Sequence, residues 1–370
     1  MPHLGGIEVL VDELSKRFAK EGHHITIISS RMAGQPVHEH ISENIVVRRI
    51  ATFNIMERFG VPYPLLAPTL LAVLIKEIRQ ADIIHLHGML QIACVSAAIL
   101  GRLFKKPIVI TEHVGFVDYK NPVINAAEMF AIKTLGRICF YSADCIVTYN
   151  AAVRKFIQLL GVKAEKIVFI PNGVDTELFT VISQKEKLKL IEELDWDSNR
   201  KHVLFIARFV VIKGVDIVIQ SRIPEYDFVL VPVTGDLGKY TGDQLKDFIL
   251  LPPVSRAQLV KIYQACDVLV LPSHGEGFPL VVQEAMACGL PIIISNDRSY
   301  LDYVDPAYVE MIEAAPSHLL VALKKILENP EELTKRSEYS RTTAVKRYSW
   351  KNSIQNYLDI FSQAQKKKKN

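Results

Sequence analysis

The stretch LPSHGEGFPLVVQEAMA, residues 271–287, decides the fold of the C-terminal half of the chain. The apolar run 268–271 predicts a buried strand, and a glycine-containing loop follows it. A helical pattern then opens at Pro279, a position where helices tolerate proline. Because no Ser, Thr, Asp or Asn stands there as an N-cap, the first N–H groups of this helix are available to an anion such as phosphate.

Two carboxylates belong to this strand, loop and helix. Glu276 lies in the loop, and Glu284 lies two turns into the helix. An ionised carboxylate accepts hydrogen bonds only, which suits it to sugar hydroxyls or to a vicinal diol. The alternative is that both are solvated surface charges.

Short apolar runs alternate with longer helical patterns along most of the chain. Because most runs are continuously apolar, they predict strands buried on both faces, as in parallel sheets covered by helices. The predicted strands are residues 25–28, 45–50, 83–86, 108–111, 145–148, 167–170, 202–206, 228–231, 248–251, 268–271 and 291–294. The predicted helices are residues 8–21, 68–79, 91–103, 123–141, 151–160, 256–265 and 279–288, with residues 316–364 helical throughout.

Length and composition exclude several classes of protein. The chain has 370 residues, 49% hydrophobic and 23% charged, so it can fill two cores and is not intrinsically disordered. A net charge of +4 falls short of a nucleic-acid-binding signature. Its five cysteines form no C-x-x-C pair, which gives no support to a zinc or redox site. No apolar stretch reaches the roughly 20 residues of a membrane-spanning helix, and the opening residues lack a signal peptide's apolar core, so we expect a cytoplasmic protein.

The alternation of strands and helices occurs in two blocks, which predicts an α/β protein with two doubly wound domains. A polar, charged seam separates the blocks. The predicted boundaries are residues 1–172 for the first domain, 173–200 for a linker and 201–349 for the second domain.

The segment with Glu276 and Glu284 resembles the E-x7-E signature of retaining GT-B glycosyltransferases of family 4, the glycosyl transferases group 1. The resemblance extends over nearly the whole chain. It implies a GT-B fold, in which two Rossmann-like domains face an interdomain cleft. The first would be the acceptor-side domain, joined by a C-terminal helix at about residues 350–370, and the second would bind the nucleotide sugar.

The resemblance also implies the donor site, with a nucleotide-diphosphate sugar as substrate and no cofactor. Arg208 and Lys213, in ARFVVIKG (207–214), match the family's R-x4-K-G element that grips the diphosphate. Two fixed cations at the end of a parallel strand can neutralise such a leaving group in any case. Glu276 would hold the sugar hydroxyls and Glu284 the ribose diol. The rest of the predicted donor site is Gly277, Phe278 and the backbone N–H groups of Leu280 and Val281.

Three segments outside the second domain match the family as well. His113, in ITEHVG (110–115), resembles a strand-end histidine near the transferred sugar, with a buried structural histidine as the alternative. Gly5 and Gly6 resemble a glycine loop that approaches the donor phosphate or the acceptor. The turn IPNGVD (170–175) resembles the family's domain junction. His85 and His87 share a strand face, but nothing nearby completes a ligand set, so we expect no metal site.

The chain departs from the family in two places. The family has a strand before its glycine loop, where this chain has four residues. Such a strand lies centrally in a doubly wound sheet, so we expect the first strand of the N-terminal sheet to be missing and the neighbouring edges to be unpaired. A chain extended upstream should then be more stable. Residues 296–302, NDRSYLD, replace the family's G-G-x-P-E stretch, so this loop and nearby acceptor contacts should differ.

The sequence thus predicts a retaining, metal-independent, hexosyltransferase-like glycosyltransferase. It would move a sugar from a nucleotide-diphosphate sugar to a glycan, glycolipid or other hydroxyl acceptor. Two alternatives stay open on the same fold: a non-catalytic sugar-nucleotide-binding subunit and a sugar-nucleotide epimerase. A nicotinamide dehydrogenase is disfavoured because no predicted strand is followed by G-x-G-x-x-G.

Two features leave a peripheral membrane contact open. Apolar side chains in residues 53–71, beside Arg58, form either an amphipathic surface for a lipid-linked acceptor or part of the core. The lysine run 366–369 is either a solvated chain end or a contact with anionic lipid. The predicted partners are therefore a nucleotide sugar and a glycan or lipid-linked acceptor, at the inner face of the membrane if a lipid is involved.

Overall fold

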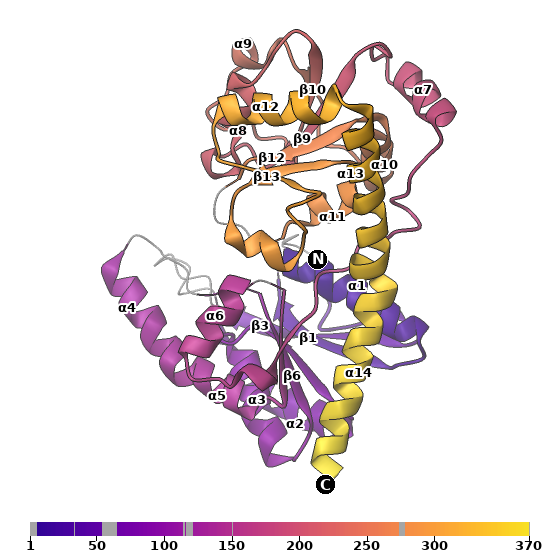
Figure 1. Ribbon diagram of the computed structural model, residues 1–370. Coiled ribbons are helices and arrows are strands. Elements are labelled where there is room, and N and C mark those ends of the chain that lie inside the picture. Colours follow the sequence, from indigo (N-terminus) through magenta and orange to yellow (C-terminus); the bar gives the residue numbers. More distant parts are fainter. Residues whose placement is uncertain are drawn as a thin grey trace. The chain divides into compact units, whose positions relative to one another are not determined.

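A computed structural model of the chain describes residues 6–32, 34–53, 65–113, 115, 121–149, 151–273 and 278–369. The chain divides into two compact units, which Figure 1 shows as two groups of helices and strands. Unit 1 comprises Met1–Pro171 and Ser353–Asn370, and unit 2 comprises Asn172–Asn352. Residues 173–200 thus fall within unit 2.

Unit 1 contains eight strands among its described residues, arranged in two sheets. The strands are β1 (Ile25–Arg31), β2 (His38–Ser42), β3 (Ile45–Phe53), β4 (Leu65–Leu66), β5 (Ile84–His87), β6 (Ile108–Glu112), β7 (Cys145–Thr148) and β8 (Ile167–Phe169). Its helices are α1 (Gly6–Lys20), α2 (Thr69–Gln80), α3 (Ile92–Leu103), α4 (Pro122–Ala131), α5 (Arg137–Ser142), α6 (Ala151–Leu159) and most of α14 (Trp350–Lys369), with a 3-10 turn η3 (Ala164–Lys166).

The sheet β5-β6-β7-β8 is parallel and forms the centre of unit 1. All five residues of β6 are buried, as expected for a strand covered on both faces. Phe18 of α1 makes edge contacts with Tyr357 and Phe361 of α14, so these two helices pack together. Helices α2, α3 and α5 pack around a shared apolar core that includes Leu74, Ala98 and Phe140.

The second sheet of unit 1 has the order β1-β3-β2, with β4 pairing on β3. Strands β1 and β3 are parallel, whereas β2 and β4 are antiparallel to β3. Among the described residues, nothing pairs with the outer edge of β1 or with the outer edge of β5. Residues 1–5, which precede α1, lie outside the described part of the chain, so the missing first strand stays a prediction.

Unit 2 has one sheet of six parallel strands, in the order β11-β10-β9-β12-β13-β14. The strands are β9 (Lys201–Ala207), β10 (Tyr226–Pro232), β11 (Ile249–Leu250), β12 (Val268–Leu271), β13 (Ile292–Ser295) and β14 (Glu310–Ile312). The helices are α7 (Gln184–Glu193), α8 (Val215–Gln220), α9 (Gly242–Leu245), α10 (Arg256–Ala265), α11 (Leu280–Ala287), α12 (Pro316–Leu327) and α13 (Pro330–Thr343), with 3-10 turns η4 (Val211–Lys213) and η5 (Arg298–Asp302) and a π turn η6 (Ala344–Tyr348).

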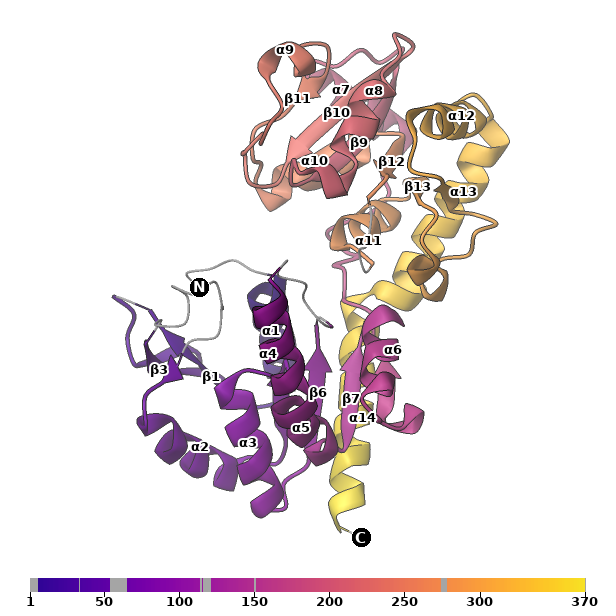
Figure 2. The ribbon, with the colours of Figure 1, turned by 90° about the vertical axis from the view of Figure 1, so that its left-hand side faces the viewer.

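The helix α7 lies within the predicted linker, residues 173–200, and packs on the rest of unit 2. Ser183 caps it together with Glu186, and Lys187 Nζ lies 2.8 Å from Asp267 Oδ1. The turn at Asn172–Val174 is anchored in the same unit, because Val174 N–H donates to Tyr348 O and a side chain on Gly173 would clash with the Trp350 ring. Helix α7 contacts α10 of the same unit, and Figure 2 shows this unit turned by 90° from Figure 1.

The parallel α/β architecture predicted from the sequence is confirmed, with corrections in detail. The polar strand β2 (HEHIS) and the short strands β4 and β14 were not predicted. The predicted helix 123–141 contains a π turn, η2 (Ile132–Gly136), and the predicted helical stretch 316–364 is confirmed, as α12, α13, η6 and the start of α14. Among the described residues, no helix combines the length and apolar character needed to span a bilayer.

Candidate functional site

The strand β12 and the helix α11 frame the predicted donor loop in unit 2. All four residues of β12 are buried, and α11 begins at Leu280 with Pro279 in the N-cap position and no side-chain cap. The first N–H groups of α11 therefore have no capping side chain, as the sequence predicted. Glu276 and Gly277, predicted in the loop between them, lie outside the described residues.

Glu284 is held inside unit 2 rather than on its surface. Glu284 is only 6% exposed. Tyr263 OH donates a hydrogen bond to Glu284 Oε2 over 3.0 Å. Burial raises the pKa of Glu284 to about 7, opposed by the Tyr263 hydrogen bond and the charge of Arg256. The alternative that Glu284 is a solvated surface charge is thus wrong. A buried carboxylate with so few polar neighbours can accept hydrogen bonds from a ligand diol.

The segment with Arg208 and Lys213 lies directly against the strand that precedes the donor loop. Lys213 ends the turn η4, and Gly214 follows with φ of +79°, a left-handed conformation that favours glycine. A Cβ at Gly214 would clash with Pro272 O, so the two backbones pack in contact. This contact places the R-x4-K-G element beside the end of β12.

The two cations of this element interact with each other. Burial, and then the charge of Arg208, lower the pKa of Lys213 to about 8. A diphosphate carries more than one negative charge and can interact with both cations of such a pair. Gly238, which follows β10, also packs on the Phe209 backbone, where a Cβ would clash with Phe209 O.

Three further donor residues from the sequence are described in the structure. Phe278 is buried, and its ring stacks on Tyr303 with centroids 4.5 Å apart, so the ring serves core packing. Leu280 is exposed at the start of α11, and Val281 is half-buried. Tyr263 OH has a single proton, which is shared between Glu284 Oε2 and Val281 O; the carbonyl lies 3.3 Å from the same hydroxyl. Tyr263 therefore ties the start of α11 to Glu284.

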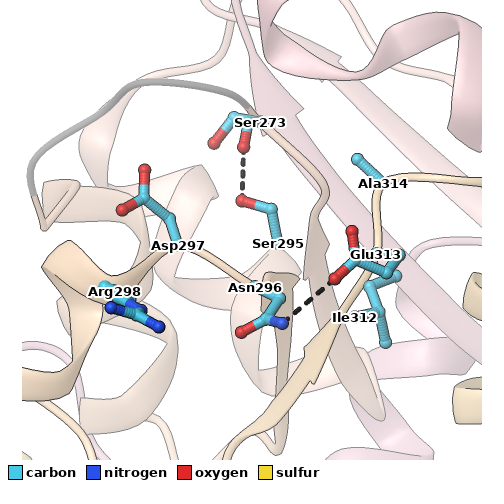
Figure 3. Close-up of a pocket in the computed structure, with 8 residues that line it drawn as sticks. All are labelled: Ser273, Ser295, Asn296, Asp297, Arg298, Ile312, Glu313 and Ala314. Carbon is cyan, nitrogen blue, oxygen red and sulfur yellow. Dashed lines mark hydrogen bonds between the residues drawn. The ribbon is translucent and has the colours of Figure 1, made fainter.

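A polar pocket of about 340 Å³ opens at the carboxyl ends of β12, β13 and β14 (Figure 3). Ser295 Oγ donates to Ser273 O, and Asn296 Nδ2 donates to Glu313 Oε1 over 3.1 Å. The altered loop 296–302 forms one wall, where Asp297 accepts from Ser299 N–H and starts η5. The pocket is lined by Ser273, Ser295, Asn296, Asp297, Arg298, Ile312, Glu313 and Ala314.

In unit 1, His113 directly follows the buried strand β6 and is itself only 7% exposed. Its Nε2 lies 3.0 Å from His87 Nδ1, and its Nδ1 lies 2.8 Å from Tyr149 OH. Burial lowers the pKa of His113 to about 4, so the ring is neutral at pH 7. Burial, followed by the charges of His85 and His113, also lowers the pKa of His87 well below its usual range.

The contacts of Tyr149 fix the protons of this cluster. The single hydroxyl proton of Tyr149 is donated to His113 O, over 3.2 Å, because a carbonyl can only accept. His113 Nδ1 must then donate to the Tyr149 oxygen, which leaves Nε2 as the acceptor of a proton from His87 Nδ1. Both ring nitrogens of His113 are thus engaged, and the ring can contact a sugar only by exchanging one of these partners.

His85 extends the same cluster toward the C-terminal helix. Its Nε2 lies 2.8 Å from Thr111 Oγ1, which lies 3.2 Å from Tyr357 OH of α14. Burial, followed by the charge of His113, lowers the pKa of His85 to about 3. Among the residues that the structure describes, no three His, Cys, Asp or Glu side chains gather as metal ligands.

The remaining predicted residues are only partly placed. Gly5 lies outside the described residues, and Gly6 begins α1. The sequence reasoning missed Tyr263 and Tyr149, which contact Glu284 and His113 from positions 21 and 36 residues away in the chain. Neither tyrosine stands in a motif, so no local pattern signals its role. The adjacency of Gly214 and Pro272 was equally invisible in the sequence.

The chain is similar to known glycosyltransferases in both of its halves. The model of Glycosyltransferase Family 4 matches residues 4–178, and the model of Glycosyl transferases group 1 matches residues 239–343. An uncharacterized glycosyltransferase of Methanocaldococcus jannaschii is 25% identical, over 98% of this chain and 95% of its own length. A D-inositol 3-phosphate glycosyltransferase of Xylanimonas cellulosilytica is 26% identical, over 98% of this chain and 93% of its own.

The structure also resembles solved ones along its whole length. It matches Anabaena HepE in complex with UDP with a TM-score of 0.76 at 18% sequence identity, over 98% of both chains. At that identity the likeness establishes the fold, and the fold is GT-B as predicted.

Proposed function

Because the chain belongs to the glycosyltransferases, with a family 4 match in its first half and a group 1 match in its second, we propose that it transfers a sugar from a nucleotide-diphosphate sugar to a hydroxyl acceptor. The observation that carries the donor assignment is the placement of Glu284. A carboxylate buried about one turn into the helix after β12 is costly unless a partner uses it. A ribose diol, with two donating hydroxyls, is such a partner.

The rest of unit 2 supports a diphosphate beside this carboxylate. Lys213 reaches the end of β12 through the Gly214–Pro272 contact, and Arg208 acts on the same lysine. The first N–H groups of α11, on Leu280 and Val281, add the positive end of a helix dipole. These groups would stabilise the negative charge that grows on the diphosphate as it leaves.

We propose that transfer retains the anomeric configuration, as in the family that the sequence resembles. The acceptor oxygen would attack the anomeric carbon from the face on which the diphosphate departs. The bond from that carbon to the phosphate oxygen breaks, and the same oxygen takes the acceptor's proton. Glu276 would hold the donor sugar in this scheme rather than act as a nucleophile, and no metal is required.

The role of His113 is narrower than the sequence suggested. Its engaged ring nitrogens make it a group of fixed orientation, set by His87 and Tyr149. We propose that it contributes shape and backbone polarity near the acceptor side, and acts on a hydroxyl only when His87 gives up its hydrogen bond.

For the nucleobase and the acceptor we propose a chemical class rather than one compound. The solved HepE structure contains UDP, so uridine nucleotides come first among donors to test. A glycan or lipid-linked hydroxyl on the cytoplasmic side is the proposed acceptor class.

The test is transfer itself. The purified protein is incubated with UDP-, GDP- and ADP-sugars and a panel of glycan and polyprenyl-linked acceptors, and the product anomer is read by NMR. We expect one donor to be consumed with retention, and Glu276→Ala to reduce the rate by about 100-fold or more without unfolding the protein. Binding of a nucleotide without transfer to any acceptor would favour the non-catalytic subunit, and an inverted product would exclude the retaining scheme.

A further inference from the structure

An exposed apolar face runs along the helical segment α4–α5 of unit 1. The segment is continuous from Pro122 to Ser142, because the π turn η2 joins α4 to α5 without leaving helical backbone angles. Five large apolar side chains on it are exposed, at up to 77% for Val123 and 71% for Phe130. This α4–α5 face comprises Val123, Phe130, Leu135, Ile138 and Tyr141.

The opposite side of the same segment fills the core, so the exposed face is not a misplaced core face. Ile132, Cys139 and Phe140 are fully buried there. A helix with apolar residues on both sides normally has a partner on each. The surface helix α13 behaves differently, because Leu333 on it is half-buried and its exposed positions carry Pro, Glu, Lys and Thr.

Charge on the α4–α5 face is of one sign. Lys133 and Arg137 are exposed between the apolar residues, and Arg137 lies over the Tyr141 ring at 5.4 Å. The segment's single acid, Glu128, has its side chain buried. The neighbouring helix α3, which lies beside α5 in Figures 1 and 2, also exposes Ile99 and Leu103.

The lysine run at the chain end lies near the end of this segment. Lys368 Nζ is 3.4 Å from Asp144 Oδ1, and Asp144 follows α5 by two residues. The positive charge of residues 366–369 is therefore brought toward the end of α5. Apolar side chains interleaved with cations are the composition of helices that lie in a membrane interface.

We propose that the α4–α5 face docks unit 1 on a bilayer that contains anionic lipids. Phe130, Ile138 and their neighbours would enter the boundary between headgroups and acyl chains, while Lys133 and Arg137 meet lipid phosphates. A second copy of the chain fits this face less well, because a two-fold contact would bring the cations of both copies into one interface, where the segment's single acid, Glu128, is buried. The proposal does not depend on the donor chemistry of unit 2.

The test is flotation of the full chain with vesicles. We expect binding to phosphatidylcholine vesicles that contain about 30% phosphatidylglycerol, at least about tenfold stronger than to phosphatidylcholine alone, and weakened by salt. Phe130→Ser with Ile138→Ser, and separately Lys133→Glu with Arg137→Glu, should each lower binding about tenfold or more.

Matched controls lie on unit 2. Val321 is 67% exposed on α12, and Lys185 and Lys189 are exposed on α7. Val321→Ser, and Lys185→Glu with Lys189→Glu, should leave binding within about twofold of the unmodified chain. All these side chains are exposed, so each variant should keep the parent melting temperature.

Three results would overturn the proposal. The first is no binding to either vesicle. The second is binding that the face variants change no more than the controls do. The third is a dimer, seen by analytical ultracentrifugation, that Phe130→Ser disrupts, since the face would then join two copies of the chain.

Discussion

Both units bury titratable side chains near the carboxyl ends of central parallel strands. The two groups differ in their hydrogen-bond partners and in their pKa values. In unit 1, both ring nitrogens of His113 have partners, and the low pKa of about 4 keeps the ring neutral. In unit 2, Glu284 is buried with Tyr263 as its hydroxyl donor and has a pKa of about 7. The hydrogen bonds of the His113 ring are complete without a ligand. Glu284, in contrast, can change its charge when a ligand binds near neutral pH.

The difference suggests a division of tasks. A closed hydrogen-bond network holds geometry, and a buried, incompletely solvated carboxylate responds to a ligand. Substitutions in the His113 network of unit 1 and in the donor site of unit 2 should therefore have different effects.

A large effect on nucleotide binding is expected from the cations beside β12. Lys213→Ala should weaken nucleotide-diphosphate binding about 100-fold, because the lysine meets the diphosphate as a charge in a partly buried site. The nucleoside without phosphates should bind the variant and the parent alike. Calorimetric titration measures both ligands, and an equal loss for both would place Lys213 outside the diphosphate site.

A smaller, pH-dependent effect is expected from Tyr263→Phe. The hydroxyl of Tyr263 lowers the pKa of Glu284, as does the charge of Arg256, so its loss should raise that pKa further. Less of the carboxylate is then ionised at pH 7, and nucleotide affinity relative to the parent should fall about fivefold to tenfold, recovering by about pH 9.

The matched control is Tyr226→Phe, which removes a similar hydroxyl contact, from Tyr226 OH to Glu328 Oε1 at 3.0 Å. This variant should show the parent's affinity at every pH. A Tyr263→Phe deficit that is constant with pH would mean that the tyrosine acts on shape alone.

The histidine network should affect turnover rather than donor binding. Tyr149→Phe removes one of the two partners that orient the His113 ring, so we expect kcat to fall about threefold to fivefold with nucleotide affinity unchanged. Steady-state kinetics and calorimetry together give both numbers. A matched change in unit 2, Tyr339→Phe, should alter neither. A loss of nucleotide affinity in Tyr149→Phe would remove the proposed division between the units.

The two groups should also give pH-dependent stability of opposite sign. Glu284 has a folded pKa above its unfolded value, so the folded state holds the extra proton and stability falls as the pH rises from about 4.5 to about 7. Glu284→Gln should therefore melt a few degrees higher than the parent at pH 8 and close to it at pH 4.

His113 has a folded pKa below its unfolded value, so its contribution is lost as the pH falls from about 6.5 to about 4. His113→Gln should gain stability relative to the parent over that range. Thermal melts at several pH values test both, and the same sign for the two variants would contradict the account.

Much of the fold followed from the sequence, because buried parallel strands are continuous apolar runs. The strands β7 and β12 match their predicted bounds residue for residue. The strand β2 was missed because it is polar and exposed on the outside of its sheet, where no apolar run is needed. The π turn in the α4–α5 segment leaves no composition signal at all.

The residues of the candidate site were likewise only partly predictable from the sequence. Motif residues such as Arg208, Lys213 and Glu284 could be chosen because charged groups after apolar strands stand out. The tyrosines that orient Glu284 and His113 could not, because their contacts span many residues and depend on packing. The engagement of both His113 nitrogens likewise follows only from the three-dimensional contacts of Tyr149.

The most direct test of the central claim is calorimetric titration of the chain with UDP, GDP and ADP, alongside Glu284→Ala. The account predicts binding of one nucleotide by the parent chain, lost by about 100-fold or more in the variant, with the variant still folded. A folded parent chain that binds none of the three, or a variant that binds as well as the parent, would contradict it.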